Sequence, residues 1–347
     1  MSKEMRFRHS SRDFVVLAKG LGLHMLQLIN MPLVDEVLKE YQDSNQLEEV
    51  CRRYGCQGIE AIWGGEDCEF SLDRKLIRGW HLAFFCDWVD LWNNNEIQLM
   101  HKFKSKKSWE MFYGGPNREA LIKLLSEDLD RAQQSGAEYV VFHVSDVSVE
   151  EVYTYQWLHS DEEVVDRTAE LINLLMDGKK YTFKLLLENL HWAGFTFTKP
   201  DITKRMLKNI HYQNKGIMLD LGHLMCTNLE LQSQEEAIDY IHKMLDEHGI
   251  LCRYIKGVHL HQSVSGEYTK EHLCIVPKLP EDYLEKFAVS YQHILNIDTH
   301  QPVTHPGIQS LIERIAPEYL VHELASSGRA DKERVLKIQT EALGWKG

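Results

Sequence analysis

Eight short apolar segments recur along the chain, and this repetition limits the possible folds more than any other feature. Each segment is rich in β-branched, leucine and aromatic residues and precedes a polar stretch with helical spacing. Residues 139–142 are continuously apolar, which is typical of parallel strands buried on both faces. We therefore expect strands at residues 22–29, 57–63, 80–86, 138–145, 182–188, 215–221, 254–261 and 318–324.

Helix boundary signals lie between these strands. Pro116 and Gly136 enclose one apolar stripe, Asp161 and Gly178 enclose a second, and Pro200 opens a third helix. Strands that alternate with helices eight times predict the α/β class, as a (β/α)₈ TIM barrel. We expect a single domain over residues 1–347, with the barrel core at about 20–345.

Two connections, residues 87–115 and 262–306, are much longer than a typical loop between a strand and a helix. Both follow strands, so we expect two insertions on the C-terminal face of the barrel, where barrel active sites lie. The first insertion combines tryptophans such as Trp88 and Trp92 with lysines such as Lys102. It is either a substrate lid or a decoration anchored by its aromatic residues, with a solvated lysine face.

Charge and composition exclude several classes of protein. The 347 residues carry a formal net charge of −13, which argues against a nucleic-acid partner, because such proteins neutralise phosphates with Lys and Arg. The sequence has neither a long uncharged apolar run nor an apolar signal core, so we expect no membrane partner and a cytoplasmic location. The seven cysteines form no CxxC pair, which favours free thiols. We expect a small-molecule substrate, and a homo-oligomer stays open.

Carboxylates and imidazoles stand at the C-terminal ends of five successive predicted strands. Side chains there that point inward converge on the barrel axis. Burying several carboxylates together is costly unless a cation lies among them, so the pattern predicts a divalent metal. Zn²⁺ suits such mixed ligands best, and Mn²⁺ or Co²⁺ also fits. The residues in question are His143, Glu188, Asp220, His223, His259, His261 and Glu323.

From about residue 139 to 326 this pattern resembles the xylose isomerase-like TIM barrels, which include sugar isomerases and epimerases and the AP endonuclease IV group. The resemblance to the sugar epimerases implies one metal held by Glu188, Asp220, His259 and Glu323, with His223 as a substrate contact. The resemblance to the endonuclease IV-like hydrolases implies a zinc cluster that also includes His143, His223, Asp298 and His300.

The resemblance has gaps. The zinc hydrolases carry a histidine on strand three, but His81 lies at the wrong end of the predicted strand 80–86, so a complete three-zinc cluster is not expected. Asp87 either substitutes for that histidine or caps a loop. Asp298 and His300 either bind a metal or substrate or belong to a turn before the next helix.

Two functions follow from this set of residues. The first is hydrolysis of a phosphoester in a small substrate, by water activated on the metal. The alternative is a metal-dependent sugar or sugar phosphate isomerase or epimerase, in which Glu188 or Glu323 moves a proton between carbons through an enediolate. The catalytic candidates are Glu188, Glu323 and His223, and the candidate substrate contacts are His261, Trp63 and Trp192. The third interpretation is a binding or regulatory barrel that has lost its catalytic activity.

Overall fold

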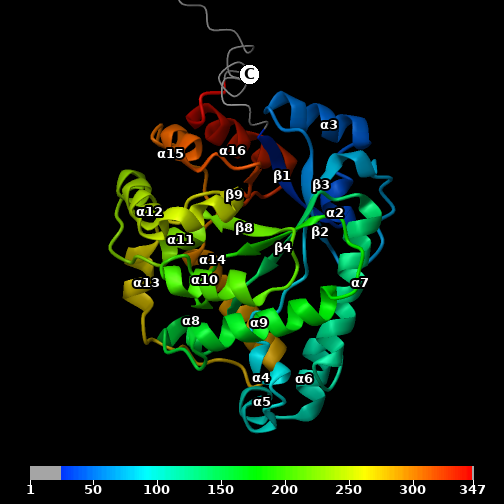
Figure 1. Cartoon of the computed structure of the whole chain (residues 1–347), viewed down its shortest axis with the longest axis vertical. Helices are drawn as coiled ribbons and strands as arrows, with labels where there is room; N and C mark the ends of the chain where they lie inside the picture. Colours follow the sequence, from blue (N-terminus) through cyan, green and yellow to red (C-terminus); the bar gives the residue numbers. More distant parts are fainter. Residues whose placement is uncertain (1–24, 346–347) are drawn as a thin grey trace, which may run out of the picture.

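The computed structural model describes residues 25–345 as a closed barrel of eight parallel strands (Figure 1). Around the barrel the strands follow the order β1-β10-β9-β8-β6-β4-β3-β2. The predicted TIM barrel is therefore confirmed. The barrel strands are β1 (Leu26–Leu33), β2 (Ile59–Trp63), β3 (Ile77–His81), β4 (Tyr139–His143), β6 (Lys184–Glu188), β8 (Lys215–Asp220), β9 (Ile255–Leu260) and β10 (Tyr319–His322).

Two strands were placed wrongly by the sequence: β1 begins four residues later than predicted, and the third strand begins and ends earlier than predicted. It runs over Ile77–His81 rather than 80–86, and the apolar residues after His81 form a loop on the barrel rim. Gly79 lies in the middle of this strand because the ring of Tyr139 occupies the space where a side chain would stand. Because this glycine interrupts the apolar run, the apolar pattern did not show where the strand begins. The first predicted strand, 22–29, begins outside the described residues.

Helices surround the barrel, except between β2 and β3, where the chain forms only the 3₁₀ turn η1 (Arg74–Leu76). The expected alternation is therefore incomplete in the second unit, because only 13 residues separate these strands. The helices between or after the other strands are α2 (Asp35–Leu38), α3 (Ser44–Arg53), α7 (Glu119–Ser135), α9 (Asp161–Met176), α10 (Pro200–Asn209), α11 (Leu221–Cys226), α12 (Gln234–His248), α15 (Ile308–Ile315) and α16 (Arg329–Ala342).

Helix ends follow local capping chemistry. Pro200 begins α10 as predicted, and Gly136 ends α7 in a left-handed conformation with φ 81°. Two predicted starts were wrong: α7 begins at Glu119 rather than at Pro116, and the N-cap of α9 is Ser160 rather than Asp161. The Ser160 side chain accepts a hydrogen bond from the amide of Glu163, which leaves Asp161 as the first helical residue.

Apolar side chains fill the interior of the barrel and form a floor below its C-terminal mouth. These buried residues are Leu28, Tyr139, Val141, Leu186, Met218, Tyr319 and Val321. Because side chains two residues apart on a strand share a face, the next inward positions include His143, Glu188 and Glu323. The candidate site therefore lies directly above a dry, packed layer.

The two insertions form helices at the C-terminal side of the barrel. Residues 87–115 contain α4 (Val89–Trp92), α5 (Glu96–Phe103) and α6 (Lys106–Tyr113), which lie together at one end of the molecule in Figure 1. Residues 262–306 contain α13 (Gly266–His272) and α14 (Tyr283–Ile297), with Tyr283 stacked on Phe103 at 3.8 Å. The remaining elements are β5 (Ser145–Asp146) and β7 (Ala193–Gly194), an antiparallel pair, with α8 (Glu151–Thr154) and η2 (Gly249–Tyr254).

A buried ion cluster and aromatic packing stabilise the first insertion from within. Lys102 is 3% exposed, and its ammonium lies 2.6 Å from Asp87 Oδ1 and 2.7 Å from Asp90 Oδ2. The expectation of a solvated lysine face is therefore wrong for Lys102, since two buried carboxylates hold it inside. Trp88 and Trp92 are buried as well.

None of the helices in the described chain has the length and apolar character needed to cross a membrane. All seven cysteines are free thiols, as the sequence predicted.

We expect Lys102→Met to lower the free energy of unfolding by about 3–5 kcal/mol, because it leaves Asp87 and Asp90 buried without their cation. Lys107→Met is the matched control, since Lys107 is exposed on α6 of the same insertion. Urea denaturation measures both. Equal stability of the two variants would show that the ion cluster does not stabilise the insertion.

Candidate metal centre

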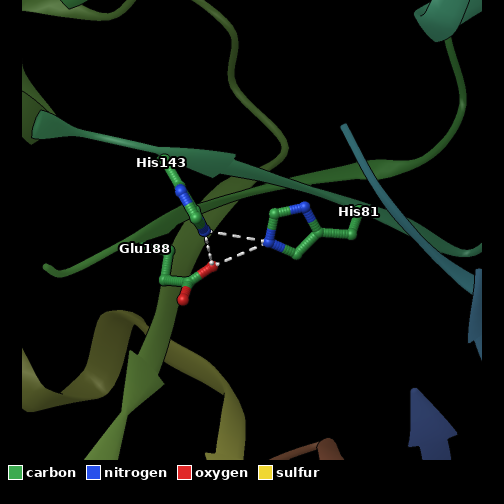
Figure 2. A group of neighbouring side chains, drawn as sticks. All are labelled: His81, His143 and Glu188. Atoms are coloured by element: carbon green, nitrogen blue, oxygen red, sulfur yellow. Dashed lines mark hydrogen bonds and ion pairs between the residues drawn. The ribbon is translucent and has the colours of Figure 1, made fainter. Parts of the chain in front are cut away.

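Three side chains from neighbouring strands form the first group at the barrel mouth. His81 ends β3, His143 ends β4 and Glu188 ends β6, and Figure 2 shows them pointing toward one another. The two imidazole Nε2 atoms lie 3.0 Å apart, and both lie near Glu188 Oε2, at 3.2 Å for His81 and 3.3 Å for His143. Two imidazole nitrogens and one carboxylate oxygen that face a common point are a typical ligand set for a transition metal.

A second group uses the other oxygen of Glu188. The His259 Nδ1 atom lies 3.2 Å from Glu188 Oε1, 3.6 Å from Asp220 Oδ2 and 2.9 Å from Glu323 Oε2. One potential ligand atom from each of these four residues lies within 4.8 Å of the others. These are the four residues that the resemblance to sugar epimerases implied.

The third group lies at the other side of Asp220. His223 Nε2 lies 3.1 Å from Asp298 Oδ2, and His300 Nε2 lies 2.6 Å from the same oxygen. Asp220 also caps α11 by accepting a hydrogen bond from the His223 amide, so the short spacing between them fixes both side chains. His300 adopts a left-handed backbone with φ 46°, which is strained for a residue with a side chain.

The residues of the second group fit a bound metal by their unsatisfied atoms. Glu188 Oε1, His259 Nδ1 and Glu323 Oε2 are buried, and the imidazole nitrogen lies within ion-pair distance of both carboxylate oxygens, but none of the three makes a hydrogen bond of good geometry to a residue of the described chain. Leaving a buried polar atom unpaired costs about 1–3 kcal/mol, and more for a charged group. A divalent cation at their centre would satisfy all three atoms at once.

The histidines fit a metal in a second way. His81 donates its Nδ1–H to the Leu82 carbonyl at 3.0 Å, His223 to the Asn189 carbonyl at 2.9 Å, and His300 to the Glu323 carbonyl at 3.1 Å. Because a carbonyl only accepts, each ring keeps its Nε2 free for a metal. Such outer hydrogen bonds are the usual support of metal-binding histidines.

Sequence reasoning missed Glu60, which supports His259 in the same manner. Glu60 is 1% exposed, its Oε1 lies 3.0 Å from His259 Nε2, and its Oε2 accepts a hydrogen bond from Tyr139 at 2.7 Å. This contact leaves His259 Nδ1 turned toward the second group. The signal was a lone carboxylate in the otherwise apolar strand Ile59–Trp63.

His81 was also placed wrongly by the sequence, which put it at the start of its strand. It is the last residue of β3 and lies in the first group, so the strand-three histidine that seemed to be missing is present. Asp87 neither replaces this histidine nor caps a loop, because it pairs with Lys102 within the first insertion.

The candidate substrate contacts have different locations. His261 is buried beside the site, with its ring stacked on that of His300 at 4.0 Å and its Nε2 3.0 Å from Asp220 Oδ2. Trp63 lies outside the barrel under the guanidinium of Arg131 on α7, because alternation along β2 turns it away from the mouth. Trp192 is buried in an apolar cluster with Val147, Val152, Tyr153 and Leu190.

Carboxylates and imidazoles lie so close together in the site that they shift each other's pKa. Burial opposes ionisation of Glu323, but His259 beside it lowers its pKa to about 2. Burial also opposes a charged His300, yet Asp298 raises the pKa of this ring to about 9. His191, which lies near His223 with both ring nitrogens unpaired, has its pKa lowered to about 3 by burial. Without a metal, the carboxylates of the site are therefore held by protonated histidines.

This arrangement belongs to a known family of barrels. The model of the xylose isomerase-like TIM barrel family matches residues 48–302, which is more than half of the chain. The chain therefore belongs to this family, and the resemblance predicted from its strand ends is confirmed. A comparison with curated protein sequences finds no match.

Solved structures with a similar fold include several sugar epimerases and isomerases. An L-ribulose 3-epimerase is 12% identical, with a TM-score of 0.50, over 92% of this chain and 94% of its own. A D-tagatose 3-epimerase-like protein is 17% identical, with a TM-score of 0.43, over 86% and 82%. A sugar phosphate isomerase/epimerase from Parabacteroides distasonis is 11% identical, with a TM-score of 0.46, over 92% and 98%. Similarity at this identity supports the fold alone.

We expect Glu60→Gln to weaken metal binding about 10- to 100-fold, because His259 loses the carboxylate that orients it. Competition with a chelator measures this affinity. The control is Glu318→Gln, which alters a carboxylate that pairs with Lys184 and Lys256 before the start of β10. An unchanged affinity in the Glu60 variant would exclude the positioning role.

Metal affinity should rise between pH 6.5 and 9, because His300, with its pKa raised to about 9, must lose a proton when it binds a metal. The same shift stabilises the metal-free protein fully below pH 6.5, and that stability is lost as the pH rises through 9. Calorimetry in buffers of different ionisation enthalpy counts the released protons. Metal binding at pH 7 without proton release would contradict this assignment.

Proposed function

We propose that the chain is a divalent-metal-dependent enzyme that hydrolyses a phosphoester in a small substrate. The observation that supports this proposal is the number of ligand groups at the mouth. His81, His143 and Glu188 form the first group. Glu188 also belongs to the second group, and Asp298 lies between His223 and His300 in the third. A site for one metal would need only the second group, with His223 as a substrate contact, and would leave His81, His143 and His300 without a role.

Bound divalent metals would supply Lewis acidity, lowering the pKa of a water molecule and stabilising both oxygens of a phosphoester displacement. Zn²⁺ is the metal we propose first, because imidazole and carboxylate ligands in about equal numbers suit it, and Mn²⁺ or Co²⁺ also fits. His81, His143 and Glu188 would hold one ion, and Glu188, Asp220, His259 and Glu323 would hold a second. His223, Asp298 and His300 would hold the third position.

The chain's own residues orient these ligands and exclude water. Glu60 fixes the ring of His259, and the Asn189 carbonyl fixes the ring of His223. The apolar layer below and the cluster around Trp192 keep bulk water from the site. In a site with so little water, charges act more strongly on a reacting group than they do in solution.

The second candidate is a metal-dependent sugar or sugar phosphate isomerase or epimerase. The family description and the names of the similar structures favour this candidate over hydrolysis. It would use Glu188, Asp220, His259 and Glu323 as ligands. Glu188 or Glu323 would move a proton between neighbouring carbons of the substrate.

The proposal extends to substrate and compartment. A net charge of −13 disfavours a polyanion such as DNA, so we propose a small-molecule substrate. Seven free thiols agree with a reducing compartment such as the cytoplasm.

His81→Ala tests the two candidates against each other. Hydrolysis predicts two or more metal ions per wild-type chain and at least one fewer in the variant, by elemental analysis. It also predicts a loss of at least about 100-fold in cleavage of bis(4-nitrophenyl) phosphate. Isomerisation predicts one metal ion in both proteins and an unchanged interconversion of ketose epimers. A wild-type chain that holds one ion and cleaves no phosphoester would contradict the hydrolase proposal.

A further inference from the structure

One buried cation near the metal centre has no carboxylate in contact with its ammonium. Lys332 lies in the first turn of α16 and is 8% exposed. Its ammonium donates to the Asn30 carbonyl at 3.0 Å and to Asn30 Oδ1 at 2.9 Å. Within the described residues 25–345, no carboxylate oxygen lies within 4.0 Å of this ammonium. Lys102, the other deeply buried lysine discussed above, has two.

This position is unfavourable for a lysine that only stabilises the fold. An ammonium that leaves water costs several kcal/mol unless an anion compensates it. Lysine is also disfavoured in the first turn of a helix, where the positive end of the dipole lies. Burial lowers the pKa of Lys332 to about 8, and the nearby charge of Glu323 only partly opposes this effect, so the two Asn30 oxygens do not fully replace water.

Asn30 connects this ammonium to the barrel mouth. Its neighbour two residues back, Leu28, belongs to the barrel interior, so alternation along β1 turns Asn30 inward as well. Asn30 pairs with Glu60 of β2, which supports the second group through His259. Because the ammonium can only donate, the Asn30 side-chain oxygen must face it. The amide Nδ2 is then a further donor, and it bonds to no residue of the described chain.

We propose that Lys332 and Asn30 form an anion subsite beside the metal centre, which binds a phosphoryl group of the substrate. The inference rests on the proposed function, because the subsite adjoins the metal groups. It adds the residues that would bind the phosphoryl group and so favour a phosphorylated substrate over a neutral sugar. An ammonium and an amide N–H₂ both donate to phosphoryl oxygens, and the negative charge supplies the compensation that Lys332 lacks.

The test uses metal-loaded full-length protein and inorganic phosphate as the probe, with binding measured by calorimetry. Lys332→Met should weaken phosphate binding about 10-fold or more, as expected for a lost charge-assisted hydrogen bond. Metal content should stay at the wild-type value. Lys337→Met is the control, because Lys337 is exposed on the same helix, and it should change phosphate affinity by less than about 2-fold.

Asn30→Asp keeps the test decisive even if the lysine variant fails to fold. This variant supplies an internal counter-charge to Lys332, so it should fold and should also lose phosphate affinity about 10-fold or more. Wild-type phosphate affinity in folded Lys332→Met, or in Asn30→Asp, would overturn the subsite. A wild-type chain that binds no metal would instead contradict the proposed function.

Discussion

The site depends on the two oxygens of one buried carboxylate. Glu188 lies at the end of β6, with one oxygen facing His81 and His143 and the other facing His259. A carboxylate this deeply buried needs positive charge on both sides. The remaining ligands surround it from neighbouring strands, and the backbone supports them by capping at Asp220 and by carbonyl acceptors at three histidines.

The barrel places the candidate ligands at the ends of its strands, and the number of ions that they bind determines which reaction is possible. A (β/α)₈ barrel with these strand ends is compatible with both sugar isomerisation and hydrolysis, so the fold cannot distinguish them. What distinguishes them is whether the first and third groups bind ions. The subsite that we propose at Lys332 and Asn30 would favour a phosphorylated substrate in either reaction, so it bears on the substrate and not on the choice between the two reactions.

Much of this could be predicted from sequence, and the errors have physical causes. Continuous apolar runs predicted six of the eight strands near their observed positions, together with the ligands at the ends of β4 to β10. His81 was missed because Gly79 interrupts the pattern of β3 to make room for Tyr139. Glu60 was missed because its role depends on contacts with Tyr139 and His259, which are distant in sequence. Trp63 was assigned to the mouth although alternation along β2 turns it outward. The positions of these three residues depend on long-range contacts and strand register, which apolar periodicity does not reveal.

The central claim is that these side chains hold divalent metal ions. Anomalous diffraction from crystals of the metal-loaded protein tests it most directly, because it locates each ion and identifies its element. The account predicts peaks about 2.0–2.3 Å from the ligand atoms of the group around Glu188 and His259 and of the group formed by His81 and His143, with a third peak beside Asp298. Metal-loaded crystals that show no anomalous peak at any of these groups would contradict it.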